Sequence, residues 1–208
     1  MKTGPKYKIC RRLGEKVFSK CQTTKFATSG SSIGGKGGGR GGSGGRPKSL
    51  TEYGRQLLEK QKARYVYGVG ERQFTNYVKS SRHGGQNSPA ERLYQAMEAR
   101  LDNIVYRAGF AISRAFARQM VSHGHITVDG RRVNIPSYQV RPGQVVGIKE
   151  ASRGKGMYRE LVERLKEYKL PEWLEVESET AVKINRLPTQ TTEHSLDFGP
   201  IIEFYSRV

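Results

Sequence analysis

The chain has 208 residues, with 37 Lys and Arg against 19 Asp and Glu, a formal net charge of +18. This length allows one sizeable core or two small ones, and the self-repulsion of so many cations indicates a polyanionic partner. A membrane partner is disfavoured, because the sequence has no apolar run of about 18 residues and no basic helix with a broad apolar face. The N-terminus, MKTGPKYKICRR, also lacks the apolar stretch of a signal peptide. We therefore expect a cytoplasmic nucleic-acid-binding protein, although charge alone does not separate RNA from DNA.

The cysteines give little sign of a metal centre. Cys10 and Cys21 are the two cysteines of the chain, and the nearest histidine is His83. Structural zinc normally takes four Cys or His ligands, so two free thiols in a reducing compartment are the favoured interpretation. A disulfide and an incomplete metal site stay open as alternatives. We predict no bound metal and no cofactor.

Residues 1–49 are expected to form a basic, Gly-rich N-terminal extension. Its centre, SGSSIGGKGGGRGGSGG at residues 29–45, has too few apolar side chains to offset the entropy of an ordered backbone. A flexible linker and a segment that threads along phosphates are both consistent with this composition. The candidate RNA-binding residues of the extension are Arg11, Arg12, Lys36, Arg40, Arg46 and Lys48.

Residues 50–97 are expected to form a helical domain. Thr51 can cap a helix that runs to about Val66, with Leu57 and Leu58 on its inward face and cations over the rest. These cations are candidates for binding RNA phosphates, together with an aromatic residue near the start of the helix. The candidates in this region are Tyr53, Arg55, Lys60, Lys62, Arg64 and Arg72.

A second helix in this domain places Phe74, Tyr77 and Val78 on one face, at positions i, i+3 and i+4. The C-terminal segment, residues 187–208, is expected to complete the same domain. Its apolar end, residues 200–205, predicts a segment that packs back on an earlier helix.

Residues 98–160 are predicted to form a helix–helix–sheet module that binds RNA. The helix leading into it starts at Ser88, where a capping box and a proline at the first turn are typical of a helix N-terminus. Its apolar face continues to Ala108, and Gly109 ends it. Ser113 then caps a shorter helix that ends at Gly124.

Beyond Gly124 the hydrophobic period changes from that of a helix to that of a strand. The sequence ITVDGRRV, residues 126–133, predicts a hairpin with a type I′ turn at Asp-Gly, and VVGI, residues 145–148, predicts a further strand. Residues 161–186 are expected to complete this second domain with an amphipathic helix, marked by Tyr158 to Tyr168, and two more strands.

Basic side chains gather on the two helices and the hairpin of this module. Arg114 and Arg118 are four residues apart, so they share the outward face of their helix. Guanidinium groups bind phosphate oxygens through two parallel hydrogen bonds, and RNA is read largely through its backbone and shape. The module's candidate RNA-binding residues are Arg100, Arg107, Ser113, Arg114, Arg118, His123, His125, Arg131 and Arg132.

Several separate motifs also stand in the order seen in a known family. Within the module they are RLDNIVYRAGF from Arg100, SRAFARQ from Ser113, HGHITVDG from His123 and PSYQVRPG from Pro136. Outside it they are YGRQLLEKQK from Tyr53, YGVGERQF from Tyr67, WLEV from Trp173 and IEFYS from Ile202. Together they resemble the bacterial form of the small-subunit ribosomal protein S-four family, over most of the chain from Leu50 onward. The resemblance implies an α+β fold, a helical body with an inserted helix–helix–antiparallel-sheet module.

The resemblance also implies a function. Such proteins are structural constituents of the small ribosomal subunit, which bind 16S rRNA early and nucleate assembly of its 5′ domain. They contact the neighbouring fifth small-subunit protein, an interface that affects decoding accuracy, and some bind their own messenger RNA. Many members hold zinc with four cysteines, but here Tyr7 stands where a C-x-x-C pattern would begin and only Cys10 remains of that pair. A zinc-free variant is therefore expected. The Gly-rich tract also replaces a Pro-Gly-Gln-His-Gly stretch of the family, whose role either passes to Lys36, Arg40 and Arg46 or is absent.

Three rival interpretations fit parts of the sequence. Arg100-Leu101-Asp102 matches the Arg-Leu-Asp of pseudouridine synthases, but here it lies inside a predicted helix, so Asp102 is expected to pair with an arginine and no catalytic residue is predicted. A DNA-binding helix-turn-helix protein is disfavoured because the helix from Ser113 has no Asn or Gln pair for reading adenine, apart from Gln119. A free RNA chaperone or translational repressor stays open. We expect neither an enzyme nor a homo-oligomer.

Overall fold

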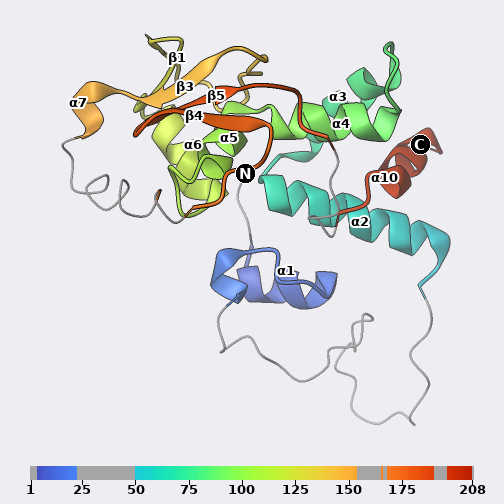
Figure 1. Cartoon of the computed structure of the whole chain (residues 1–208). Helices are drawn as coiled ribbons and strands as arrows, with labels where there is room; N and C mark the ends of the chain where they lie inside the picture. Colours follow the sequence, from blue (N-terminus) through green and yellow to red (C-terminus); the bar gives the residue numbers. More distant parts are fainter. Residues whose placement is uncertain (1–3, 23–49, 154–164, 166–167, 190–195, 208) are drawn as a thin grey trace. The chain divides into compact units, whose positions relative to one another are not determined.

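A computed structural model describes residues 4–22, 50–153, 165, 168–189 and 196–207 (Figure 1). The chain divides into two compact units: unit 1 comprises residues 1–83 and 192–208, and unit 2 comprises residues 84–191. The boundary at His83 lies ahead of the one expected at residue 97. The predicted α+β class is confirmed, with helices in both units and one five-stranded antiparallel sheet in unit 2. Within the described residues, no helix combines the length and hydrophobicity needed to span a bilayer.

Unit 1 is helical in its described part, with α1 (Lys6–Leu13), the 3-10 turn η1 (Ser19–Cys21), α2 (Glu52–Tyr67), α3 (Glu71–Arg82) and α10 (Gly199–Ser206). Thr51 caps α2 as predicted, because its Oγ1 accepts a hydrogen bond of 3.2 Å from the backbone N–H of Gly54. The chain end docks on α2, which confirms the prediction for residues 200–205. The rings of Tyr53 and Phe204 lie 5.5 Å apart, and Gln56 donates to Glu203 at 2.9 Å.

The buried face of α2 differs from the prediction. Leu57 and Leu58 are only half-buried. The side chains that α2 buries are Gln56, Lys60, Lys62, Ala63 and Tyr67. Gln56 and Lys60 have partners on other helices, Glu203 and Glu71, which the periodicity of α2 alone does not reveal.

Unit 2 starts with α4 (Pro89–Glu98), α5 (Leu101–Arg107) and α6 (Arg114–Ser122). The prediction of one continuous helix to Ala108 was wrong, because the helix breaks at Ala99 and Arg100. There the backbone pairs with a distant segment instead: Leu101 N–H donates to Tyr138 at 2.9 Å, and Val140 N–H donates to Ala99 at 2.9 Å. These bonds satisfy backbone groups that a continuous helix would have paired internally.

The sheet of unit 2 consists of β1 (Ile126–Val128), β2 (Arg131–Arg132), β3 (Val145–Ile148), β4 (Leu174–Ser178) and β5 (Ala181–Ile184), in the order β2-β1-β3-β5-β4. The predicted hairpin is confirmed, since Val128 pairs with Arg131 and both turn residues, Asp129 and Gly130, have positive φ (49° and 76°). The helix α7 (Glu150–Arg153) follows β3. The amphipathic helix predicted around Tyr158 to Tyr168 falls largely outside the described residues.

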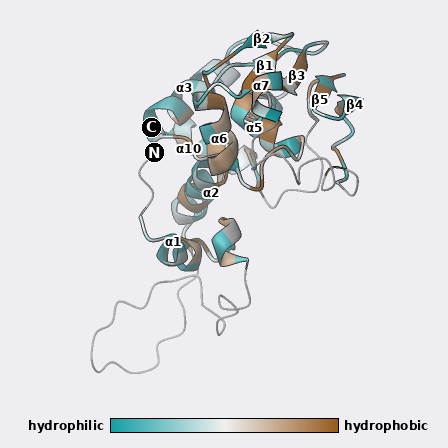
Figure 2. Ribbon diagram, turned by 90° about the vertical axis from the view of Figure 1, so that its left-hand side faces the viewer, coloured by the Kyte–Doolittle hydropathy of each residue, from teal (hydrophilic) through white to brown (hydrophobic). Residues whose placement is uncertain are grey.

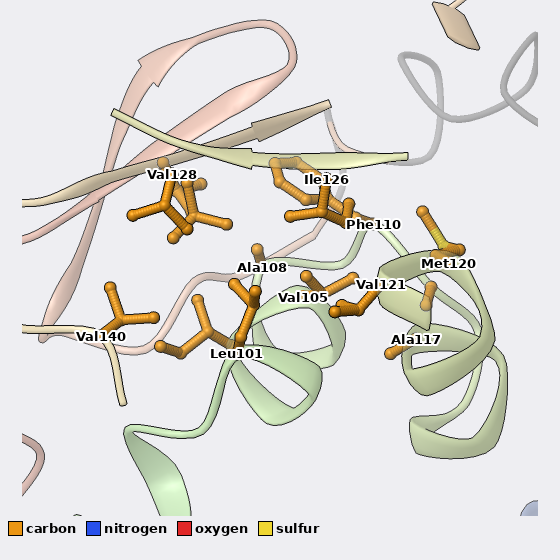
Figure 3. Packing of buried hydrophobic residues seen from close by; sticks show 14 of the residues in the cluster. Leu101, Val105, Ala108, Phe110, Ala117, Met120, Val121, Ile126, Val128 and Val140 are labelled. Atoms are coloured by element: carbon orange, nitrogen blue, oxygen red, sulfur yellow. The ribbon is translucent and has the colours of Figure 1, made fainter. Parts of the chain in front are cut away.

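The core of unit 2 lies between the sheet and the pair α5–α6 (Figure 3). Leu101 and Val105 of α5 and Val121 of α6 face Ile126 and Val128 of β1, and all five are at most 4% exposed. The face of the α5–α6 pair that packs on the sheet is therefore apolar and stabilises the fold. The polar side chains of α5 and α6 lie on their other faces.

Candidate RNA interface

A buried carboxylate holds the end of α5. Glu98, fully buried at the end of α4, accepts hydrogen bonds from Arg107 Nε at 2.9 Å and Nη2 at 3.0 Å. Its Oε2 also accepts from Asn103 Nδ2 at 2.8 Å. The two parallel bonds are the geometry in which guanidinium and carboxylate groups fix each other most firmly. The side chain of Arg107 is therefore held in one orientation.

A second buried carboxylate, Asp102, organises two further arginines. It accepts from Arg100 Nε at 3.0 Å and Nη2 at 2.6 Å, and lies 3.5 Å from Arg118 Nη1. Arg100 is fully buried, whereas the side chain of Arg118 is 41% exposed. The expectation that Asp102 pairs with an arginine is confirmed. Arg100 was wrongly expected at the surface, because its guanidinium is enclosed with Asp102 and cannot reach a phosphate.

Arg114 is anchored in the same network. Its Nε donates to Asn103 Oδ1 at 2.8 Å, and its guanidinium carbon lies 4.4 Å from the centre of the Tyr106 ring. A guanidinium over an aromatic face gains cation–π stabilisation. Asn103 thus accepts from Arg114 while its amide donates to Glu98, and it links α5, α6 and the end of α4.

This network, which we call the arginine network, comprises four arginines and two carboxylates, a formal charge of +2. Its members are Glu98, Arg100, Asp102, Asn103, Arg107, Arg114 and Arg118. The carboxylates are buried, while Arg107, Arg114 and Arg118 are only partly covered. The excess positive charge therefore lies toward solvent in fixed positions, which suits recognition of a phosphate backbone.

The hairpin adds a second basic surface next to the end of α6. Arg131 and Arg132 form β2, are exposed, and make this strand hydrophilic in Figure 2. Arg132 packs over Gly124, which has a φ of 71°, and a Cβ at that position would collide with its guanidinium. His125 shares a hydrogen bond of 3.0 Å with Ser152 through its Nδ1, and its ring centre is 6.1 Å from that of exposed His123.

The predicted site residues fall into four groups. Those exposed are Arg11, Arg12, Tyr53, Arg55, Arg72, His123, Arg131 and Arg132. Those half-buried are Arg64, Arg107, Ser113, Arg114, Arg118 and His125. Those buried are Lys60, Lys62 and Arg100. Those outside the described residues are Lys36, Arg40, Arg46 and Lys48.

Ser113 has a structural role at the start of α6. Its Oγ accepts from the backbone N–H of Phe116 at 3.3 Å, which is the predicted N-cap. The hydroxyl is thereby occupied on its acceptor side, and the residue sets the direction in which α6 presents Arg114.

Lys60 was expected to bind RNA but is committed to the interior of unit 1. Its Nζ lies 2.9 Å from Glu71 and 4.5 Å from the centre of the Phe204 ring. Glu71 also accepts from the Tyr205 hydroxyl at 2.7 Å and pairs with Arg64. Burial alone would raise the pKa of Glu71, but these donors and cations outweigh it and lower the pKa.

Lys62 is likewise buried and paired, with its Nζ 2.6 Å from Glu15 and 2.8 Å from Glu59. Burial would lower the pKa of Lys62, but the hydrogen bonds to the two carboxylates raise it above its ordinary value. The lysine therefore joins the N-terminal segment to α2. Its predicted role at an RNA surface was wrong, because the sequence does not show that Glu15 lies next to α2.

Sequence reasoning missed two members of the arginine network, Glu98 and Asn103, and the ring of Tyr106 that packs against Arg114. The burial of Glu98 could have been predicted, since it follows Met97 on the buried side of a helix. A buried charged residue requires a partner of opposite charge. Asn103 and Tyr106 carried no comparable signal. Their role depends on the crossing of α5 and α6.

The two cysteines are free, buried and close enough to share a hydrogen bond. Burial, followed by the neighbouring Cys10 thiol, raises the pKa of the Cys21 thiol to about 11. Within the described residues, no three His, Cys, Asp or Glu side chains form a group that could hold a metal ion.

Comparisons with known proteins show the family to which the chain belongs. Residues 99–146 match the S4 domain, and residues 1–98 match the ribosomal protein S4/S9 N-terminal domain. The chain is 42% identical over 211 residues to small ribosomal subunit protein uS4 of Thermotoga maritima, covering 99% of this chain and 98% of the relative. It is 43% identical over 210 residues to the protein of the same name from Natranaerobius thermophilus, covering 98% of each. The chain therefore belongs to the S4 family of small-subunit ribosomal proteins, which are RNA-binding structural components and not enzymes.

Proposed function

We propose that the chain binds 16S rRNA directly through the arginine network and the hairpin of unit 2. The observation that carries this proposal is the pair of buried carboxylates beside partly exposed guanidinium groups. Glu98 holds that of Arg107 through two hydrogen bonds, and Asp102 lies 3.5 Å from that of Arg118. Side chains ordered before binding lose less conformational entropy when they engage a ligand. A solvated basic face would not need buried anchors of this kind.

The surface proposed to contact phosphates in unit 2 combines the partly exposed arginines of α5 and α6 with the basic end of the hairpin. Its residues are Arg107, Arg114, Arg118, His123, His125, Arg131 and Arg132. In unit 1 the exposed candidates add a second contribution, from α1, α2 and α3. These residues are Arg11, Arg12, Tyr53, Arg55 and Arg72. Arg100, Lys60 and Lys62 are excluded because they are buried.

The test is the salt dependence of binding to a transcript of the 16S rRNA 5′ domain. Replacing Arg114 and Arg118 with Gln should flatten the slope of log K against log salt by roughly 0.7–0.9 for each phosphate that is no longer neutralised. Glutamine is chosen because glutamate would place like charge beside Asp102. Arg186→Gln is a single-charge control, to be compared with each single variant of Arg114 and Arg118. Arg186 is exposed and pairs with Glu172 at 2.7 Å, and the two residues flank the β4–β5 hairpin in the sequence. A slope that is the same in the double variant and in the wild type would refute the proposal.

We further propose that the chain joins 16S rRNA early, nucleates assembly of the 5′ domain, contacts the fifth small-subunit protein and thereby affects decoding accuracy. Family membership supports this, as does a net charge of +18, which favours binding to RNA before other proteins mask it. Ordered-addition reconstitution tests it: omitting the chain should reduce incorporation of the fifth protein. A chain that stays free of the small subunit when lysates are sedimented at high and low magnesium would instead indicate a free repressor acting on messenger RNA, or an RNA chaperone.

A further inference from the structure

The outermost strand of the sheet, β4, is a free edge in the described part of the chain. It pairs only with β5, in the register Leu174↔Ile184 and Val176↔Val182. A strand in this position presents unpaired backbone N–H and C=O groups on its outer side, which can pair with another chain. Val176 on this strand is 61% exposed, so part of its apolar side chain is open to solvent.

An apolar cavity lies beside this edge. It has a volume of about 190 Å³ and its lining includes Phe110, Leu170, Val176 and Val182. Pockets for metabolites and cofactors are larger, roughly 300–1,000 Å³, and carry convergent polar groups. The size and lining suit a single apolar side chain inserted from a neighbouring segment.

The charge around β4 is opposite to that of the rest of the molecule. Residues 171–187 contain four glutamates and two basic residues, a net charge of −2 in a chain of +18. Glu172 pairs with Arg186, and Glu175 accepts from Asn185 at 2.9 Å. Glu177 and Glu179 are exposed and have no ion pair within the described residues. Their carboxylates would repel RNA phosphates, so an RNA occupant is disfavoured.

We propose that the β4 edge, with its cavity and glutamates, is a docking site for an extended, lysine- or arginine-rich segment of another protein. The segment adds to the sheet as a further strand, with its backbone paired to β4 and an apolar side chain in the cavity. Basic side chains of the segment then lie near Glu177 on β4 and near Glu179 in the turn that follows it. Main-chain pairing gives affinity in this mode of recognition, and the pockets and charges give specificity. The site is separate from the RNA-binding residues and does not depend on their assignment.

The test uses the full chain and a short fluorescent peptide of alternating lysine and valine, with an alternating glutamate and valine peptide as control. Binding is measured by anisotropy at physiological ionic strength, where the Debye length of about 8 Å restricts attraction to nearby charges. The lysine peptide should bind at β4. The glutamate peptide can associate with the basic surfaces of the chain but should not protect β4. Amide hydrogen exchange should slow at residues 174–178 when the lysine peptide is present, because the outer edge becomes paired.

Two single variants of equal charge change separate this site from general electrostatics. Glu177→Lys should weaken binding of the lysine peptide roughly fivefold or more, because it removes a direct partner and adds repulsion. Glu150→Lys, an exposed change on α7, should change affinity less than twofold. Equal effects of the two variants, protection that appears only outside β4, or displacement of the peptide by an RNA oligonucleotide would each overturn the proposal.

Discussion

The buried pair Arg100–Asp102 predicts a large loss of stability when its acid is neutralised. Asp102→Asn removes a carboxylate charge that lies 2.6 Å from the guanidinium of fully buried Arg100. Removing one partner of a buried ion pair typically costs about 3–5 kcal/mol, because the remaining charge stays desolvated. We expect unit 2 to lose about 3 kcal/mol of its free energy of unfolding.

Unfolding of unit 2 can be followed by itself. Trp173 is the single tryptophan of the chain, is 7% exposed and belongs to the core of unit 2. Its fluorescence during urea unfolding therefore reports this unit even though the whole chain need not unfold in one step. With a urea m-value of about 1–3 kcal/mol/M, the expected loss lowers the midpoint by roughly 1–3 M.

Two companion variants sharpen this measurement. Glu172→Gln removes a surface pair whose side chains are 85% and 58% exposed, and should cost no more than about 1 kcal/mol. Replacing both Arg100 and Asp102 with Leu removes both charges of the pair, and should recover much of the stability that Asp102→Asn loses. If Asp102→Asn shifts the midpoint no more than Glu172→Gln does, the pair is not the buried anchor described here.

Three further outcomes are expected. Gly124→Ala should lower both the stability of unit 2 and its RNA affinity, because φ is positive there and the added Cβ meets the guanidinium of Arg132. Gly130→Ala is its control, since φ is also positive there but the added Cβ meets open space. That variant should mainly cost about 1–2 kcal/mol of backbone strain. Folding raises the pKa of the Cys21 thiol from 9.0 to about 11. Between pH 9 and 11 this thiol therefore ionises in the unfolded chain before it ionises in the folded one, which lowers the stability of unit 1. The urea midpoint of unit 1, followed by circular dichroism, should be insensitive to this thiol below pH 9 and fall between pH 9 and 11. Glu98→Gln should weaken rRNA binding in filter assays although it adds to the net positive charge, since Arg107 loses its anchor.

Local signals in the sequence predicted local structure well. The Asp129-Gly130 turn formed because both positions need positive φ, which these residue types tolerate better than others. The caps at Thr51 and Ser113 formed because their hydroxyls satisfy N–H groups that lie three residues away. Each of these features depends on a few neighbouring residues, so no knowledge of the tertiary fold is needed.

The failures share one physical cause, which is that the deciding partner lies far away in the sequence. The break at Ala99 requires backbone from Tyr138 and Val140, and the burial of Lys62 requires Glu15. Nothing near Ala99 departs from a helical pattern, and a lysine on α2 is normally exposed. Hydrophobic periodicity describes one element at a time and does not report such pairings.

The acidic residues explain more of this molecule than its excess of positive charge does. Glu98 and Asp102 are buried where they orient arginines, and Glu71 is placed where it joins three elements of unit 1. If affinity for RNA followed net charge, neutralising any of these carboxylates would strengthen binding. If it follows the positions of guanidinium groups, neutralising Glu98 must weaken binding, while neutralising Glu177, which orients no described side chain, must not. Comparing these two changes of equal charge therefore separates attraction by bulk charge from recognition by ordered side chains.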